Sequence, residues 1–385
     1  MSVNERGKVL HLHPDDGEQP KKKNPVGRVI LLSFVLLLAA AAVCFLYLRS
    51  GLREGGAANR ESAGYVFEEG RAFCAHRGGI AAVTAGGFSV YDSLGNTLGT
   101  AQHVYSVPVV RSGGLYALAF DVGGTRLSVL NERGETVLDR ESEGTLLDAD
   151  ISSGGAVCLA ELLTGYRTVI SVFDSRQNEI YRYYSASRYL AQCAVSEDGQ
   201  YLCAAALGSS GSRYESTAVI FRTDAQEALF ELPLGDELVR DLRFVGEETL
   251  CAVLENSVVL FNLQGERLGS FDCGESYLRD CSLDGSGFIA LSLNKYQAGS
   301  RYSVALLDLQ GNCLAEQYLG EEILSLSCSG DRCAVLTSGA LYIYDQNLNL
   351  IASTGEAKAA SAAIMQEDGS ALLISGDVGT RFKPD

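Results

Sequence analysis

Hydrophobic and polar positions along this chain form one recurring local pattern, in which a short apolar run, a polar turn and a second apolar run follow one another. Seven segments show the pattern, and they begin at Ser89, Ser128, Ser171, Val219, Val259, Ala305 and Tyr342. SVFDSRQNEI and VLFNLQGERL are two examples. Apolar runs rich in β-branched and aromatic residues, separated by Asp, Asn and Gly, are typical of strands joined by tight turns. The pattern therefore predicts seven β-hairpins.

Each repeat also carries an earlier hairpin. VSEDGQYLCAAAL (195–207), SLDGSGFIALSL (282–293) and ISSGGAVCLAEL (151–162) place a polar, Gly-containing turn between two apolar strands. The full unit thus has four strands, and the units recur at intervals of 37 to 48 residues. A four-stranded unit of this length is typical of a β-propeller blade. One β-sandwich would not use seven near-identical units, and helical periodicity is nearly absent after residue 60.

The two ends of the repeat array are incomplete. Residues 361–382 supply two clear strands and a short third, and an isolated extended stretch, GYVFEEG, precedes the first repeat at 64–70. A ring of sheets leaves exposed edges unless one terminus completes the last blade. We therefore predict an all-β propeller of about eight four-stranded blades over residues 65–385, with the last blade closed by an N-terminal strand at 65–69. Seven blades is the alternative.

A different pattern precedes the repeats. Residues 29–48, VILLSFVLLLAAAAVCFLYL, contain no charge, and a helix of this length spans a hydrocarbon layer of about 30 Å. We predict a transmembrane helix at 29–48, after a disordered basic tail at 1–28 and before a linker at 49–64. A cleaved signal peptide is the alternative, but the run is long and no clean cleavage site follows it. The basic cluster at 21–28 favours a single-pass protein of the cell membrane, with its N-terminus in the cytoplasm and the propeller outside.

Charge and cysteine content narrow the partners and the compartment. The formal net charge is −17, and residues 51–385 alone carry −20, which argues against a nucleic-acid partner. Ten of the 11 cysteines follow the apolar segment. Cys193 with Cys203, and Cys328 with Cys333, flank single predicted turns and are candidate disulfides. Cys158 and Cys203 lie in apolar runs, where Cys behaves as a small buried hydrophobe, so free thiols are the other interpretation.

Residue patterns for catalysis or cofactor binding are scarce. His11 and His13 lie in the predicted tail, His76 and His103 stand alone, and the chain has no CxxC, HExxH or EF-hand motif. It also lacks GxSxG, and it has no Trp on which a quinone cofactor would stack. With 48 Asp and Glu residues, pairs of carboxylates carry little information. We predict no metal, no cofactor and no enzymatic activity.

Arg and Tyr cluster in the longest predicted loops. TGYRT (164–168), GSSGSRYES (208–216) and NKYQAGSRYS (294–303) join second to third strands, and YRYYSASRY (181–189) and SYLRD (276–280) lie between blades at the same end. Arg and Tyr are enriched in binding hot spots. The candidate binding residues are Tyr166, Arg167, Arg182, Tyr184, Arg188, Arg213, Tyr214, Tyr277, Arg279, Tyr296, Arg301 and Tyr302. Alternatively, Arg is simply this domain's usual cation and Tyr a common strand residue. The opposite face, with tight turns such as DSLGN, is expected to leave little room for a ligand.

The SxDGxxL hairpins and the blade period resemble those of WD40-like and related bacterial propellers. The order of a short basic tail, one membrane span and a Cys-containing propeller is similar to that of an uncharacterised family of single-pass, membrane-anchored propeller proteins of Gram-positive bacteria. That resemblance implies a propeller and a membrane anchor, and it brings no catalytic residues.

The sequence therefore favours a non-catalytic interaction or ligand-sensing module at the cell envelope. Its partners would be the membrane, through residues 29–48, and an unknown protein, peptide or glycan. Two alternatives remain open. One is an enzyme that processes envelope glycan or peptide, which requires converging carboxylates in a pocket at the channel mouth. The other is a passive structural subunit of an envelope complex.

Overall fold

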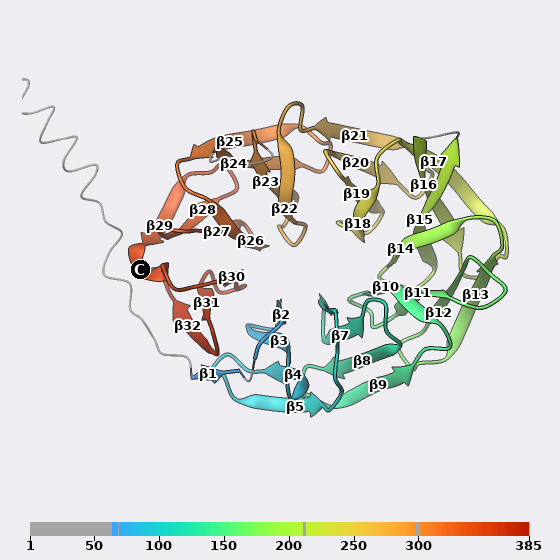
Figure 1. Ribbon diagram of the computed structural model, residues 1–385, viewed down its shortest axis with the longest axis horizontal. Coiled ribbons are helices and arrows are strands. Elements are labelled where there is room, and N and C mark those ends of the chain that lie inside the picture. Colours follow the sequence, from blue (N-terminus) through green and yellow to red (C-terminus); the bar gives the residue numbers. More distant parts are fainter. Residues whose placement is uncertain (1–63, 68, 211–212, 297–300, 385) are drawn as a thin grey trace, which may run out of the picture. The chain divides into compact units, whose positions relative to one another are not determined.

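The strands of this protein form eight antiparallel sheets of four strands, arranged as blades around a central axis (Figure 1). The computed structural model describes residues 64–67, 69–210, 213–296 and 301–384. In seven blades the strands follow chain order, with the first strand innermost and the fourth at the rim. The eight-bladed prediction is confirmed.

The first four blades are built from consecutive strands. Blade 1 contains β2 (Ala72–His76), β3 (Gly79–Thr84), β4 (Gly87–Tyr91) and β5 (Thr97–Ala101); blade 2 contains β6 (Pro108–Gly113), β7 (Tyr116–Asp121), β8 (Arg126–Asn131) and β9 (Thr136–Glu141); blade 3 contains β10 (Thr145–Ile151), β11 (Val157–Leu162), β12 (Thr168–Phe173) and β13 (Glu179–Ser185); and blade 4 contains β14 (Tyr189–Val195), β15 (Tyr201–Ser210), β16 (Arg213–Arg222) and β17 (Ala228–Gly235).

Three further blades continue in the same way, and the eighth combines both ends of the propeller. Blade 5 contains β18 (Val239–Phe244), β19 (Thr249–Leu254), β20 (Ser257–Asn262) and β21 (Arg267–Asp272); blade 6 contains β22 (Tyr277–Ser282), β23 (Phe288–Asn294), β24 (Tyr302–Asp308) and β25 (Cys313–Leu319); blade 7 contains β26 (Ile323–Ser329), β27 (Arg332–Thr337), β28 (Leu341–Asp345) and β29 (Leu350–Thr354), followed by the 3-10 turn η1 (Gly355–Ala357); and blade 8 contains β30 (Ala362–Met365), β31 (Ala371–Ser375), β32 (Val378–Phe382) and β1 (Tyr65–Val66).

The ring closes where β1 pairs with β32. Tyr65 lies opposite Gly379, and the backbone N–H of Phe67 donates to the carbonyl of Asp377 at 2.7 Å. The Tyr65 side chain is fully buried and packs against the rings of Phe67 and Tyr91. Its hydroxyl donates to the carbonyl of Asp92 in blade 1, at 2.6 Å. The strand is shorter than the 65–69 expected from sequence, but its side chains fill the seam between blades 8 and 1.

The seven repeated hairpins are the connections between third and fourth strands, and in six of them the same side-chain cap holds the turn. In DSRQN, Asp174 Oδ1 accepts from the backbone N–H groups of Arg176 and Asn178, and Asn178 Nδ2 donates to Asp174 Oδ2. Such caps satisfy backbone donors that a tight turn leaves unpaired. The equivalent caps are centred on Asp92, Asn131, Asn262, Asp308 and Asp345. The repeat therefore encodes a self-capped turn.

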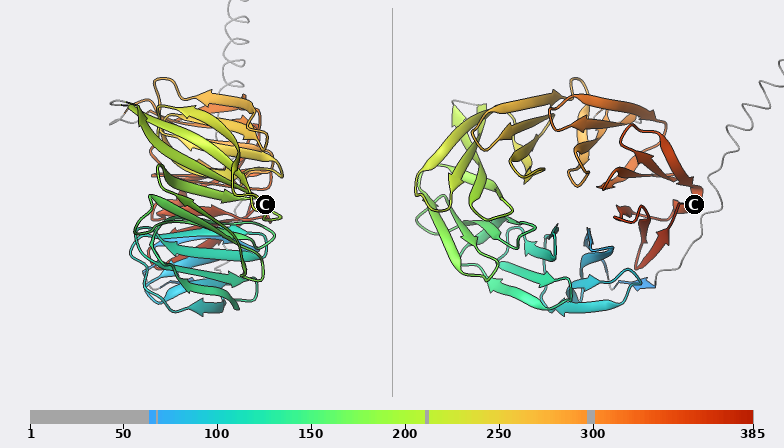
Figure 2. Two further views of the ribbon diagram at one scale, coloured as in Figure 1. Left: turned by 90° about the vertical axis from the view of Figure 1, so that its right-hand side faces the viewer. Right: turned by 180° about the vertical axis from the view of Figure 1, so that it is seen from behind.

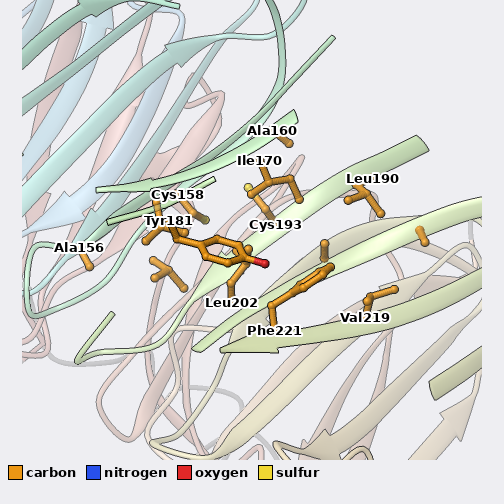
Figure 3. Close-up of a cluster of buried hydrophobic side chains, with 14 residues drawn as sticks. Ala156, Cys158, Ala160, Ile170, Tyr181, Leu190, Cys193, Leu202, Val219 and Phe221 are labelled. Carbon is orange, nitrogen blue, oxygen red and sulfur yellow. The ribbon is translucent and has the colours of Figure 1, made fainter. Parts of the chain in front are cut away.

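The hydrophobic core lies between neighbouring blades. Figure 3 shows one such cluster, in which Ile170 and Tyr181 of blade 3 face Leu190 and Phe221 of blade 4. Neighbouring blades pack face to face because each blade is apolar on both of its faces. Strand β12 illustrates this, since all of its residues are buried. Similar clusters join the other blades around the ring.

The cysteines are part of these clusters. All ten cysteines of the described residues are free thiols. Cys328 lies directly opposite Cys333 across β26 and β27. Cys203, however, lies opposite Ala194, and the thiol next to Cys193 is Cys158 of the neighbouring blade. The pairing considered for Cys193 and Cys203 is therefore not the contact that the fold makes.

The predicted tail at 1–28, helix at 29–48 and most of the linker at 49–64 lie outside the described residues. In the part of the chain that the structure does describe, no helix is both long and apolar enough to cross a membrane.

Candidate functional site

The loops between second and third strands, and those from one blade to the next, leave the same end of the antiparallel blades. We call this end the loop face. The predicted binding residues fall there or on the adjoining ends of strands, in two groups. One group belongs to blades 3 and 4, and the other belongs to blade 6, two blades further around the ring (Figure 1).

The group on blades 3 and 4 contains two clusters of stacked Tyr and Arg side chains. The rings of Tyr166 and Tyr184 lie 4.7 Å apart, and the Arg182 guanidinium lies 5.6 Å from the Tyr184 ring. Arg167 stacks 5.0 Å from the Tyr189 ring and donates to its hydroxyl at 2.6 Å. We call these five residues the Tyr/Arg ladder. Its three tyrosines are each 41–47% exposed, although large aromatic side chains are usually buried in the core.

Carboxylates already engage two of the predicted arginines. Arg182 pairs with Glu143 at 2.8 Å and with Glu161 at 3.5 Å, and Arg188 forms two hydrogen bonds with Glu231. The bond from Arg188 holds the pKa of Glu231 below its ordinary value. These two arginines therefore position the neighbouring strands. Among the described residues, Arg167 has no ion pair with a carboxylate, so it is the ladder's cation best placed to meet an anionic or carbonyl group of a partner.

Next to the ladder, the hairpin of β15 and β16 extends beyond the ring, as Figure 2 shows. Each strand has 10 residues, whereas the corresponding strands of blade 2 have six. Arg213 and Tyr214 lie near its tip and are strongly exposed. Arg213 lies 4.0 Å from Asp236, and an ion pair this long between two exposed side chains is weak.

The blade 6 group is looser. Arg279 lies 6.0 Å from the Tyr277 ring and donates to the carbonyl of Tyr296 at 3.2 Å. Arg301 stacks on Tyr318 at 5.1 Å, and Tyr302 begins β24. Sequence reasoning missed both Tyr189 and Tyr318. Tyr189 ends the quoted YRYYSASRY segment, so the signal was present there, whereas Tyr318 lies on a rim strand with no loop signal.

A second candidate site lies inside the ring, where charged side chains of the inner strands meet. Arg111 of β6 is buried, and its guanidinium lies 3.1 Å from Asp148, 3.7 Å from Asp150 and 3.2 Å from Asp241. Arg243 continues the network, 3.3 Å from Asp241 and 3.7 Å from Asp284. Burial raises the pKa of Asp148 to about 6 despite Arg111. Burial also acts to raise the pKa of Asp241, but Arg243 and Arg111 outweigh it and hold that pKa below its ordinary value.

Most inner polar side chains have a structural partner. Asp148 accepts from the backbone N–H of Cys193 at 2.9 Å, and Asp150 accepts from that of Val195 at 3.2 Å. Ser282 binds the N–H of Cys328 in the same way, at 2.9 Å. An innermost strand has an edge with unpaired backbone groups, and the polar side chain of the preceding blade satisfies them. These aspartates and serines therefore have a structural reason to be where they are.

The structure corrects the expectation that the face opposite the loop face has little room. Two cavities of about 540 and 420 Å³ lie along the inner strands, and both reach the turns between first and second strands on that face. The turns between third and fourth strands, such as DSLGN, are tight, but the turns between first and second strands leave space around the central axis. Among the residues that the structure describes, no group of three or more His, Cys, Asp or Glu is arranged to hold a metal ion.

These features define an eight-bladed, WD40-like β-propeller with an aromatic and cationic loop face and a polar channel. The chain belongs to the Family of unknown function (DUF5711), which it matches over residues 63–376. No curated protein sequence matches it.

Solved structures show the same fold. The C-terminal WD40 domain of Sif2 is similar, with a TM-score of 0.60 and 11% identity, over 85% of this chain and 99% of that chain. BamB from Moraxella catarrhalis is similar with a TM-score of 0.50 and 13% identity, over 80% of this chain and 95% of that chain. Kuenenia stuttgartiensis hydrazine synthase matches with a TM-score of 0.48 and 15% identity, over 74% of this chain and 99% of that chain. Such low identities speak to the fold alone.

Proposed function

We propose that this protein is a non-catalytic interaction module at the cell envelope, held in the membrane by residues 29–48, whose propeller captures a protein partner through the Tyr/Arg ladder. The observation that carries the proposal is the ladder itself. Three exposed tyrosines and two arginines form two stacked clusters on the loop face of blades 3 and 4, beside a projecting hairpin. Large rigid aromatics combined with a planar cation are the usual content of binding hot spots.

Two of the inner carboxylates, Asp148 and Asp150, support a non-catalytic role. A general acid or base must reach the substrate, but Asp148 and Asp150 are buried and already bound to Arg111 and to backbone N–H groups. The charge of the domain also shapes the choice of partner. Because residues 51–385 carry −20, a partner is attracted to Arg167 only at short range and in the right orientation, which favours specificity over strength.

Site-specific photo-cross-linking in cells tests the binding surface. A benzophenone amino acid at Tyr184 is expected to give a discrete adduct, whereas the same group at Leu94, an exposed residue on the opposite face, gives none. Arg167→Ala should weaken partner capture at least ten-fold, and Arg133→Ala, in an exposed outer turn, should leave it unchanged. Identical adducts from Tyr184 and Leu94, or normal capture by the Arg167 variant, would rule out the ladder and favour a passive structural subunit.

The location is tested separately. A tag after Asp385 should be removed by protease added to intact cells if the propeller lies outside the membrane. Protection until lysis would place the propeller in the cytoplasm and overturn the envelope assignment. Protection of this kind would not affect the ladder result, so the two parts of the proposal fail independently.

A further inference from the structure

The two cavities of the channel form one continuous site. They share Ser112, Gly114, Arg243 and Asp284 on their common boundary. The first cavity, of about 540 Å³, is bounded mainly by blades 1, 2, 6, 7 and 8. The second, of about 420 Å³, is bounded by the inner turns of blades 2 to 6. A ligand that fills both would extend across the ring from blades 8 and 1 to blades 4 and 5.

Charge is divided between the two halves. The first cavity is lined by four arginines and two carboxylates, which are Arg71, Arg77, Arg111, Arg243, Asp284 and Glu367. The second is lined by four carboxylates and one arginine, which are Asp150, Glu197, Glu247, Asp284 and Arg243. Buried carboxylates already neutralise Arg111 and Arg243, whereas the ion pairs of Arg71 and Arg77 are long, at 3.8 and 4.0 Å, and partly exposed. Arg71 and Arg77 are therefore the cations of the first half that can meet an anionic group, and the carboxylates of the second half favour a cationic one.

One buried side chain in the first half lacks any partner. Gln366 is 1% exposed and lines the cavity, yet neither its amide oxygen nor its amide nitrogen has a hydrogen-bond partner in the described structure. An unsatisfied buried polar group costs about 1–3 kcal/mol, so such groups normally meet water or a ligand. The amide nitrogen of Gln366 can donate to a carboxylate, and its amide oxygen can accept from a peptide N–H, so the C-terminal residue of a peptide offers a partner to each.

Arg77 adds a second feature beside Gln366. It occupies the first position of the β2–β3 turn with φ of 50°, a conformation that favours Asn or Gly. Its side chain is half-exposed, and within the described part of the chain its ion pair is a long one, with Glu132 at 4.0 Å. A strained residue that lines a cavity is a candidate for a functional role.

We propose that the channel binds a short zwitterionic peptide, with its C-terminal carboxylate held by Arg77 and Gln366 and its N-terminal ammonium held by Glu197 and Glu247. The Arg243–Asp284 pair lies at the boundary between the two halves. Because blades 8 and 1 face blades 4 and 5 across the ring, an extended chain spans the site and a single amino acid does not. This site is separate from the Tyr/Arg ladder and goes beyond the proposed capture of a protein.

Calorimetric titration of the full chain in detergent with tetraalanine tests the site. We expect tetraalanine to bind, and its N-acetylated and C-amidated forms each to bind at least ten-fold more weakly. The double variant Glu197→Gln, Glu247→Gln should bind the free and N-acetylated peptides equally, because it removes the groups that recognise the ammonium. Arg77→Ala should bind the free and C-amidated peptides equally, because it removes the group that recognises the carboxylate.

A matched control and a contrary result complete the test. Asp331→Asn changes an exposed acidic residue on the same face outside both cavities, and it should keep the preference for the free N-terminus. All the substituted residues lie in turns outside the strands, and thermal unfolding would confirm that every variant is folded. The proposal is overturned if tetraalanine shows no binding at millimolar concentration, or if the acetylated and free peptides bind the unaltered protein equally.

Discussion

Arg111 of blade 2 donates to Asp241 of blade 5 across the centre of the ring, with 3.2 Å between Nη2 and Oδ1. The same guanidinium binds the carbonyl of Ala149 at 2.8 Å and the carboxylate of Asp148 at 3.1 Å. One side chain therefore connects three blades whose strands belong to three separate sheets.

Removing this connection should destabilise the whole ring. Arg111→Met leaves Asp148, Asp150 and Asp241 buried without their shared cation, and breaking a buried ion pair from one side costs about 3–5 kcal/mol. Denaturant unfolding should show a loss of this size at pH 7 and a smaller loss at pH 4, where the carboxylates can be neutral. Arg133→Ala, on an exposed turn, should change stability by less than about 0.5 kcal/mol. A loss for Arg111→Met no larger than for this control would contradict the structural role.

Two buried groups should give opposite pH signatures. The folded-state pKa of Asp148 is raised to about 6 by burial, so its contribution to stability is lost as the pH rises from about 4 to 6. The folded-state pKa of His76 is lowered to about 4, first by burial and then by Arg77, so its contribution is lost as the pH falls from about 6.5 to 4.

Substitution separates the two effects. From pH 4 to pH 7, the free energy of unfolding of Asp148→Asn should rise relative to the unaltered protein by about 3 kcal/mol, at 1.36 kcal/mol for each unit of pKa. That of His76→Gln should fall by a similar amount over the same range. Unfolding curves measured at half-unit pH steps would show both trends. If the free energy of unfolding of a variant and of the unaltered protein changed in parallel with pH, the substituted group would be excluded as the source of the pH dependence.

The closure of blade 8 should depend on two residues. Residues 64–385 alone are expected to fold with the stability of the full propeller, since Tyr65 and Phe67 carry the contacts of the seam. Tyr65→Ala should cost about 3–5 kcal/mol, as for other buried aromatics, because it removes a fully buried ring and its hydrogen bond to Asp92. Exposed Val66→Ala, in the same strand, is the control. Equal effects of the two substitutions would mean that the seam is not closed by Tyr65.

One turn should be improvable. Gln177 has φ of 67° at a position where Gly95, Gly134, Gly265 and Gly311 occupy the equivalent turns. Gln177→Gly should raise the free energy of unfolding by about 0.5–1 kcal/mol, because glycine adopts this conformation without strain. Leu348 shares the conformation, but its side chain is buried, so Leu348→Gly should destabilise. Thermal unfolding of both variants measures this, and stabilisation by both would show that packing of Leu348 is irrelevant.

Thiol reactivity should single out Cys313, the exposed cysteine among those described. Burial raises the pKa of Cys74, Cys273 and Cys281 to about 12 each, so these thiols stay protonated and react slowly near pH 8. In a disulfide-exchange assay on folded residues 64–385, Cys313→Ser should abolish the fast phase, whereas Cys281→Ser should leave it. A fast phase that survives in Cys313→Ser would point to opening of the core.

Local pattern predicted most of the architecture, because each blade is specified by its own turns. The cap formed by Asp174 and Asn178 lies within five consecutive residues. Such a short-range pattern can be recognised in the sequence without a structure. The contact from Arg111 to Asp241 joins residues 130 apart and left no local trace. Tyr189 was missed because its role depends on stacking with Arg167 from the adjacent blade. The channel cavities were missed because the tightness of outer turns says nothing about inner ones.

The way β1 closes the ring has a mechanical consequence. β1 is the N-terminal strand of the propeller, and its pairing with β32 involves Tyr65 and Val66. Any tension that reaches the propeller along the N-terminal segment is therefore borne first by the seam between blades 8 and 1. A pull strong enough to detach β1 would open the closed ring into a curved array with two free edges.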